Sequence, residues 1–313
     1  MTCLGMDVGH SSVKLSWRGP DGNVVKLMIP SVVIPAMRIT DKTAADTALD
    51  DTVDVAGNTY FIGNTALHEV GNLRVSGLHD RWLDMKEFRA LVQGAIDKVT
   101  RNAGKIERIV TGLPASTFHE QQLKMRNIVS ACLDTQIRVL PEPNGIYLQH
   151  MIGLEGGVRK DRVVNAGIVA IGRYTTDFMA LLDGRWVEGV AGSCSGMSRA
   201  ANLLLKQLKN EGLDVDYLDA DDALWKREIR NYGKTVDVSR DADRALSILG
   251  SEIFDSASAR FGDVGRKLEK IFVGGGGADL LIGELTEYWP QAELVEDPRF
   301  AVAEGFRRLG ESL

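Results

Sequence analysis

The chain has 313 residues, of which 44% are hydrophobic and 26% are charged, and its net charge at pH 7 is −6. This composition is typical of a soluble globular protein with one large domain or two medium-sized ones. The negative net charge excludes a global basic surface of the kind that holds nucleic acid and leaves only a local basic patch open.

The first half is predicted to open as a three-stranded meander. Residues 3–7 are apolar, 12–18 alternate between apolar and polar, and 24–29 are apolar again after the turn sequence GPDGN. The following pattern predicts a hairpin over 54–63, helices over 85–104 and 117–133, strands over 108–114 and 136–141, and a helix after Pro143. Two prolines in LMIPSVVIPAM argue against a regular core strand. An exposed contact loop and packing beneath the first domain are both open for that segment.

The second half repeats the opening pattern after a glycine- and charge-rich linker candidate at 153–162. Strands are predicted over 163–172, 175–184 and 185–192. Laying residues 4–25 over 167–187 puts Gly9 on Gly172 and Ser12 on Thr175, which indicates an internal duplication. Helices are then predicted over 197–210, 240–264, 278–288 and 300–309, with a strand in KIFVGGGG. The acidic stretch 214–224 is expected to be a solvated face, with a contact to another subunit or an adaptor as the alternative.

The cysteines and the chain ends favour one cellular location. Cys3, Cys132 and Cys194 are far apart and lack the spacing of a metal site, which favours a reducing cytoplasm. The N-terminus lacks the basic and apolar regions of a signal peptide. No segment reaches the roughly 18 to 20 apolar residues of a transmembrane helix. We therefore expect a cytoplasmic protein without a membrane partner.

The stretch MDVGHSSVKL has the residue types of a phosphate loop. An aspartate at a strand end is followed by a glycine and hydroxyl side chains in a tight turn, which suits a polyphosphate with its divalent cation. Asp7 would hold the metal through water, Gly9 would let the backbone approach, and Ser11, Ser12 and Lys14 would contact phosphate oxygens. A polar β-turn with an incidental aspartate is the alternative.

Two further motifs carry candidate chemistry. FVGGGGADLL runs from a strand through Gly274–Gly277 into a helix that begins at Ala278, so backbone can approach a flat ligand or a phosphate there. It matches neither a Walker A loop nor the GxGxxG fingerprint, and a flexible turn is the alternative. In LPEPNGIY, Glu142 lies between two prolines after a strand and could orient a water or accept its proton. A helix-start glutamate favoured by the helix dipole is the alternative.

Together these motifs resemble those of the actin-like ATPase superfamily. MDVGHSSVKL is similar to its first phosphate loop, LPEPNGIY to its first connecting segment and IVAIGRYTTDF to its second phosphate loop. FVGGGGADLL is similar to its adenosine motif, and RFAVAEGFRRLG to its second connecting helix, with Ala303 and Gly305 at the helix-crossing positions. All five motifs occur in the expected order across the whole chain.

The resemblance implies an α/β fold: the actin-like (ribonuclease H-like) duplicated two-domain fold with a nucleotide cleft between the domains. It implies domain I over 1–157, with the C-terminal helix 298–313 packed on it, and domain II over 158–297. ATP or ADP and Mg²⁺ would be the cofactors, with Asp7 and Glu142 as catalytic residues of an ATPase. The implied nucleotide-binding residues are Gly9, His10, Ser11, Ser12, Lys14, Gly172, Arg173, Tyr174, Thr175, Thr176, Asp177, Ser195, Gly196, Gly274, Gly275, Gly276, Gly277 and Ala278.

Three details resemble the ParM/StbA branch, whose members are plasmid-segregating filament proteins: D-x-G-x-x-x-x-K-L, P-E-P-x-G and T-T-D-F. That branch implies head-to-tail self-association with ATP. It also implies a DNA-binding adaptor on a plasmid centromere, so that DNA contact would be indirect. A small-molecule kinase and a non-polymerising ATP-binding scaffold are the alternatives, although no acid or histidine stands out as a base for an acceptor hydroxyl.

The sequence departs from the superfamily pattern at Ala170, where members commonly have an aspartate. Losing one water-positioning group costs a few kcal/mol of barrier, or about 10²-fold or more in rate. We therefore expect ATP binding with slow hydrolysis led by Glu142, unless Asp177 takes over the positioning of the metal.

Overall fold

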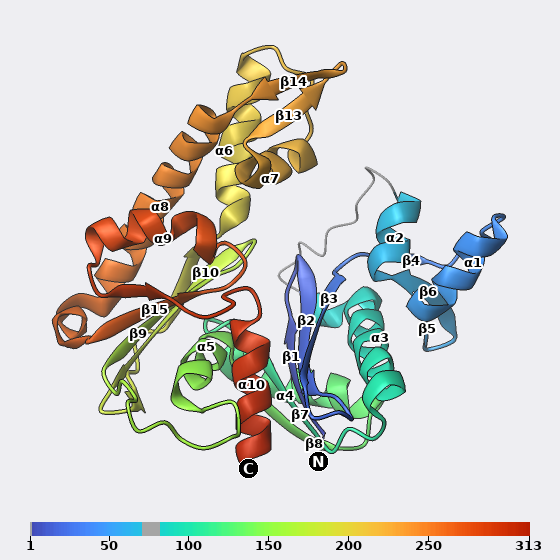
Figure 1. The fold of residues 1–313 in the computed structure, drawn as a ribbon, viewed down its shortest axis with the longest axis horizontal. Helices are drawn as coiled ribbons and strands as arrows, with labels where there is room; N and C mark the ends of the chain where they lie inside the picture. The colour runs from blue at the N-terminus through green and yellow to red at the C-terminus, as the bar shows by residue number, and fades with distance from the viewer. Residues whose placement is uncertain (1, 71–81) are drawn as a thin grey trace. The chain divides into compact units, whose positions relative to one another are not determined.

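Two compact units, each with its own central sheet, make up the computed structural model, which describes residues 2–70 and 82–313 (Figure 1). The first unit comprises Met1–Leu113, Thr117–Lys160 and Val302–Leu313, and the second comprises Pro114–Ser116 and Asp161–Ala301. The chain thus leaves the first unit for three residues after Leu113, leaves it again after Lys160, and returns to it with its C-terminal helix.

The first unit is built on a five-stranded sheet in the order β3-β2-β1-β7-β8. The strands β1 (Cys3–Val8), β2 (Ser12–Arg18) and β3 (Val24–Pro30) form the predicted antiparallel meander. Next to β1, the strands β7 (Arg108–Leu113) and β8 (Gln136–Pro141) run parallel to it. This mixed arrangement brings the end of β1 and the ends of β7 and β8 to the same edge of the sheet.

Helices cover both faces of this sheet. On one face, α3 (Lys86–Ala103) and α4 (Phe118–Cys132) bury their apolar sides against the alternate β1 residues, such as Leu4 and Met6. Gly104 ends α3 with a positive φ of 75°, as its residue type predicts. The other face carries α5 (Glu142–Met151) and α10 (Ala301–Ser312). Figure 1 shows α3 and α10 on opposite sides of β1 and β2.

A small three-stranded sheet in the order β4-β6-β5 completes the first unit. Val33 and Ile34 of the proline-containing segment are 4% and 6% exposed and pack in the first unit, whereas Met28 and Met37 near its ends are 41% and 52% exposed. The elements of this part are β4 (Val33–Pro35), α1 (Lys42–Ala48), η1 (Leu49–Asp51), β5 (Thr52–Val55), β6 (Asn58–Ile62), α2 (Gly63–Val70) and η2 (Trp82–Asp84).

The second unit repeats the strand order of the first around the sheet β11-β10-β9-β15-β16. Its β9 and β10 are antiparallel, and β15 and β16 run parallel to β9. The strands are β9 (Ala166–Ile171), β10 (Thr175–Leu182), β11 (Arg185–Trp186), β12 (Gly192–Ser195), β15 (Lys270–Gly274) and β16 (Ala292–Leu294). The outer elements are α6 (Met197–Asn210), α7 (Tyr217–Lys226), β13 (Glu228–Asn231), β14 (Lys234–Asp237), α8 (Ser239–Phe261), η3 (Gly262–Lys267) and α9 (Ala278–Tyr288).

Three sequence-based expectations require correction. The strand expected over 185–192 ends at Trp186, and β12 begins only at Gly192 after Gly189 adopts a φ of 83°. The acidic stretch 214–224 is more than a solvated face, because it forms most of α7 and buries Leu224. The helix expected after Pro143 begins two residues earlier, at Glu142, which places the proline in its first turn, where a proline is tolerated.

The two opening hairpins have the same register, which confirms the predicted duplication. The last pair of β1 and β2 is Val8 with Val13, and the last pair of β9 and β10 is Ile171 with Thr176. Gly9 and Gly172 therefore occupy equivalent positions directly after the first strand of each hairpin.

The helix α10 lies unusually close to its neighbours because glycines face it. A Cβ atom at Gly5 of β1 would lie 1.9 Å from the carbonyl oxygen of Ala303, and one at Gly145 of α5 would lie 2.5 Å from that of Val302. From the helix itself, a Cβ atom at Gly305 would lie 1.8 Å from the carbonyl oxygen of Gly145. No side chain fits at these three positions unless the backbone moves.

We expect Gly305→Ala to destabilise the chain by about 3 kcal/mol or more, because its methyl group would have to push α5 away from α10. Gly283→Ala in α9 is the matched control, since within the described part of the chain no heavy atom lies within 4 Å of its Cβ position. That change should stabilise the helix by up to about 1 kcal/mol. Urea unfolding monitored by circular dichroism measures both, and equal effects of the two substitutions would contradict the close crossing.

Candidate functional site

The first hairpin loop places a buried ion pair beneath its backbone. Asp7 of β1 is 6% exposed, and its Oδ2 lies 3.0 Å from Nζ of Lys14, its cross-strand partner on β2. A Cβ atom at Gly9 would lie 3.3 Å from this Nζ, so the loop backbone passes close to the pair. Ser11 is exposed at the tip, whereas Ser12 is buried at the start of β2. The structure therefore brings the predicted acid, the predicted cation and the glycine together.

Two residues that the sequence did not reveal hold this loop. Ser31 Oγ donates a hydrogen bond of 2.5 Å to the Gly9 carbonyl, and its N–H donates one of 3.0 Å to the carbonyl of Ser11. The imidazole of His10 stacks on Trp82 with ring centroids 5.7 Å apart. Burial lowers the pKa of His10, against the opposite effect of Asp7, so the ring is neutral at pH 7.

The second hairpin loop is tied to the start of α6. The N–H groups of Met197 and Ser198 donate hydrogen bonds of 3.0 and 2.7 Å to the carbonyls of Gly172 and Arg173. A Cβ atom at Gly196 would lie 2.6 Å from the Gly172 carbonyl oxygen, which explains the glycine there. Carbonyl groups of the loop thus accept hydrogen bonds from these N-terminal N–H groups of α6, and the carbonyl of Tyr174 accepts a further one from the Gly196 N–H.

The four-glycine turn packs against the end of β9. Gly275 has a φ of 94°, and a Cβ atom there would lie 2.5 Å from the carbonyl oxygen of Ile171. The N–H of Gly277 donates to that same carbonyl at 3.0 Å. At Gly276, no heavy atom of the described residues lies within 4 Å of the Cβ position, so this face of the turn is open to a ligand. Gly274 and Ala278, which flank the turn, are buried.

Asp177 is a buried carboxylate of the second hairpin, and it lies directly across that hairpin from Ala170. It is 2% exposed and accepts hydrogen bonds from Thr175 Oγ1 at 2.9 Å and from the Ala115 N–H at 3.1 Å. Burial raises its pKa to about 6, although both hydrogen bonds lower it. An acid with this pKa exchanges its proton near neutral pH, as general acid–base chemistry requires.

Two other predicted residues have structural contacts. Thr176 is fully buried, and its hydroxyl donates a 3.0 Å hydrogen bond to the carbonyl of Ser195 on β12. Glu142 begins α5, and its Cγ would lie 2.9 Å from a Cβ atom at Gly112 of β7. The carboxylate of Glu142 is thereby placed beside the end of the parallel strands of the first unit.

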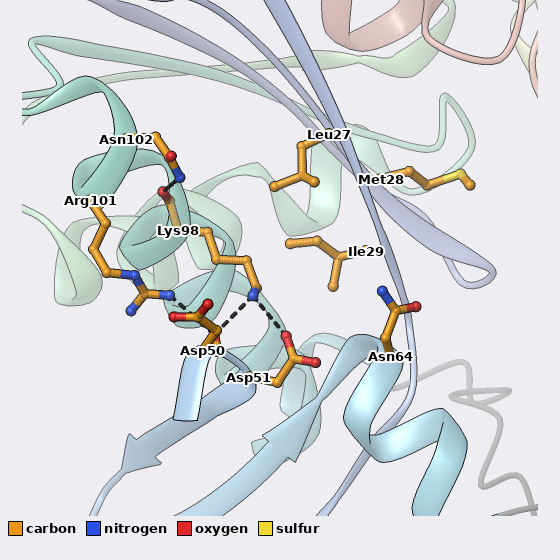
Figure 2. Close-up of a pocket in the computed structure, with 9 residues that line it drawn as sticks. All are labelled: Leu27, Met28, Ile29, Asp50, Asp51, Asn64, Lys98, Arg101 and Asn102. Carbon is orange, nitrogen blue, oxygen red and sulfur yellow. Dashed lines mark hydrogen bonds and ion pairs between the residues drawn. The ribbon is translucent and has the colours of Figure 1, made fainter. Parts of the chain in front are cut away.

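A separate pocket of about 370 Å³ in the first unit contains none of the predicted site residues (Figure 2). The ammonium group of Lys98 in this pocket is already paired, because its Nζ lies 2.7 Å from Asp51 Oδ1 and donates to the carbonyl of Asp50 at 2.8 Å. It is lined by Leu27, Met28, Ile29, Asp50, Asp51, Asn64, Lys98, Arg101 and Asn102.

Among residues 2–70 and 82–313, no helix combines the length and the apolar character that crossing a bilayer demands. The same residues contain no group of three or more His, Cys, Asp or Glu side chains that could hold a metal ion.

Two family models match consecutive parts of the chain. "Actin like proteins N terminal domain" matches residues 5–145, and "Archaeal actin homologue MreB-like, C-terminal" matches residues 168–287. The class of protein that the duplicated units and their loops define is therefore the one that the sequence motifs predict. The chain belongs to the actin-like proteins. No protein with a curated description matches it at significant similarity.

Solved structures share this fold over the whole length. The subunit of a 15-stranded ParM filament from Clostridium botulinum has a TM-score of 0.77 at 18% identity, covering 100% of this chain and 99% of that chain. The archaeal actin homolog Ta0583 in complex with ADP has a TM-score of 0.74 at 19% identity, covering 99% of each. MamK from a double helical filament has a TM-score of 0.74 at 20% identity, covering 100% and 99%. These likenesses confirm the actin-like two-domain α/β fold.

We expect Asp177→Asn to stabilise the chain at neutral pH. The Asp177 carboxyl has a pKa of about 6 in the folded state and near 4 in the unfolded state. The folded protein therefore loses stability as pH rises from about 4 to 6, because the unfolded chain releases this proton first. Asn keeps the shape without the charge, so the free energy of unfolding of the variant relative to that of the wild type should rise by about 2–3 kcal/mol as pH increases from 4 to 7.5.

Urea unfolding of both proteins at several pH values measures this difference, since all other titrating groups are common to the two. Parallel stability profiles for the wild type and the Asn variant would show that Asp177 ionises normally.

Proposed function

We propose that this chain is an ATP-binding, filament-forming protein that segregates plasmid DNA through an adaptor–centromere complex. The hairpin loops and the four-glycine turn are its nucleotide-binding elements, and the two units correspond to actin-like domains I and II. The observation that carries the proposal is the pair of hairpins with identical register, each ending in a glycine and polar side chains, in a fold shared over its full length with filament subunits.

The first loop suits a Mg²⁺–phosphate ligand. Oδ1 of Asp7 has no hydrogen bond or ion pair within the described part of the chain, so one carboxylate oxygen is available beside the Lys14 ammonium. Mg²⁺ typically keeps several waters and takes only one or two protein carboxylates together with substrate phosphates. Asp7 would hold the waters of the ion and Lys14 would neutralise a phosphate oxygen. When bound, the ion would neutralise charge on the phosphates.

Hydrolysis would depend on two carboxylates. Glu142 would orient the attacking water from the first turn of α5, whose dipole favours the ionised form. Asp177 lies directly across from Ala170, the position where relatives commonly have an acid, and its proton exchange near pH 6 suits a proton acceptor. Asp177 is 2% exposed and lies on the strand opposite position 170, which supports slow turnover.

Plasmid DNA is the cargo that the sequence details favour. The net charge of −6 opposes direct binding to DNA, so an adaptor would connect filament and plasmid. Naked DNA that sediments with filaments in the absence of any other protein would contradict this indirect contact.

We expect Ala170→Asp to raise ATP turnover of the assembled protein by about 10²-fold in the presence of Mg²⁺. Ala170→Asn is the control for size, because it adds a similar side chain without charge and should leave turnover low. Without nucleotide, the Asp variant should be less stable at neutral pH, because two carboxylates then face each other across the strands. Phosphate release measures turnover, and a wild-type rate equal to that of the Asp variant would refute slow hydrolysis.

We expect the chain to sediment as filaments with ATP and Mg²⁺ and to remain in the supernatant with ADP. Because hydrolysis is slow, the filaments should persist for much longer than the time they need to assemble before they return to subunits. Pelleting combined with electron microscopy in ATP, ADP and no nucleotide measures this. A chain that binds ATP but stays monomeric in all three conditions would instead be a non-polymerising scaffold.

A further inference from the structure

Arg173, at the tip of the second hairpin loop, is bound to the helix α7. Its Nη2 lies 3.0 Å from Oδ2 of Asp221, and the two side chains are only 17% and 25% exposed. The guanidinium also lies over the rings of Tyr217 and Tyr174, with its Cζ 5.4 and 5.8 Å from their centroids. Loop and helix are therefore joined by an ion pair that aromatic rings shield from water.

This joint leaves hydrogen-bonding capacity unused. Arg173 Nε is buried and makes no hydrogen bond of standard geometry among the residues that the structure describes, and the Tyr217 hydroxyl interacts with the same guanidinium. A guanidinium binds best when Nε and an adjacent nitrogen donate in parallel to two oxygens of one anion. Asp221 takes up only part of that capacity, so an anion that also accepts from Nε would compete well for the same side chain.

The rest of the loop and of α7 is firmly held. The carbonyl of Arg173 accepts from the Ser198 N–H, which fixes the loop backbone to α6. At the start of α7, Asp216 and Asp219 form a reciprocal capping box, and at its end Arg227 pairs with Asp243 at 3.0 Å. The Arg173 side chain is thus the part that can change partners while both backbones stay in place.

We propose that Arg173 is a phosphate-binding residue whose availability is set by Asp221, which occupies the guanidinium until a nucleotide phosphate displaces it. This inference rests on the proposed ATP binding. Binding of a nucleotide at the loop then releases the first turns of α7 from the loop. Nucleotide binding thereby changes how the outer part of the second unit is held. Asp221 acts as a built-in competitor that weakens nucleotide binding.

The test is a double-mutant cycle of Arg173→Ala and Asp221→Asn, with Asp222→Asn as the matched control. Asp222 is on the same helix and carries the same charge, but it is 69% exposed and pairs with Lys226. ATP affinity with Mg²⁺ is measured by calorimetry. Removing a competing ion pair of this exposure should tighten ATP binding by about three- to tenfold in Asp221→Asn. Asp222→Asn should change it by no more than about twofold, and in the Arg173→Ala background Asp221→Asn should have no effect.

Each outcome decides a different point. An equal gain from Asp221→Asn and Asp222→Asn, or a gain that persists without Arg173, would overturn the exchange and leave the proposed function intact. No ATP binding by the folded wild type would overturn the proposed function, and the exchange with it. A cycle measured without nucleotide, by urea unfolding, reports whether the pair forms at all. Additive effects there would contradict the ion pair itself.

Discussion

The buried carboxylate of Glu304 is the interaction on which the arrangement of the first unit depends. It is 1% exposed and accepts hydrogen bonds from Ser16 of β2 at 2.7 Å and from the side chains of Arg307 and Arg308. Arg308 in turn donates to the carbonyls of Gln149 and Ile152 at the end of α5. Burial alone would raise the pKa of Glu304, but these bonds hold it at about 2, so the charge persists at all physiological pH values. One carboxylate thus connects the hairpin that carries Asp7 to the helix that carries Glu142, and the glycine contacts of α10 provide the space for it.

The duplicated hairpins differ most at one pair of positions. Across the first hairpin Asp7 faces Lys14, and at the equivalent place in the second hairpin Ala170 faces Asp177. In the first unit the acid is on the first strand and its charge is balanced by the lysine. The acid of the second unit is on the opposite strand, has no cation beside it in the described structure, and is stabilised by two neutral donors. The same backbone therefore supports a charged loop in one unit and a loop with a titrating acid in the other.

Local signals were sufficient to predict much of this molecule. The turn sequences, the alternating apolar residues and the four glycines predicted both hairpins, the β15 turn and α9, because each depends on residues that are adjacent in sequence. The short β12 and the hairpin of β13 and β14 were not predicted, since neither has a clear period of two. The supports of the candidate site were also missed. Ser31, Trp82 and the Ala115 amide act on residues tens of positions away, and nothing in their own surroundings in the sequence marks them.

The two loops also differ in how completely their polar groups are satisfied, and this difference indicates where a ligand has most effect. In the first loop the Lys14 ammonium pairs with one oxygen of Asp7, the carbonyls of Gly9 and Ser11 accept hydrogen bonds from Ser31, and His10 is stacked. In the second, Asp177 is buried without a counter-charge among the described residues, and Arg173 Nε is buried without an acceptor. Buried polar groups that lack full compensation raise the free energy of the ligand-free state, so a ligand that supplies the missing charge or acceptor gains more there. Binding energy at the second loop is therefore available to change the structure around it, and α7 is the element attached to that loop through a side chain.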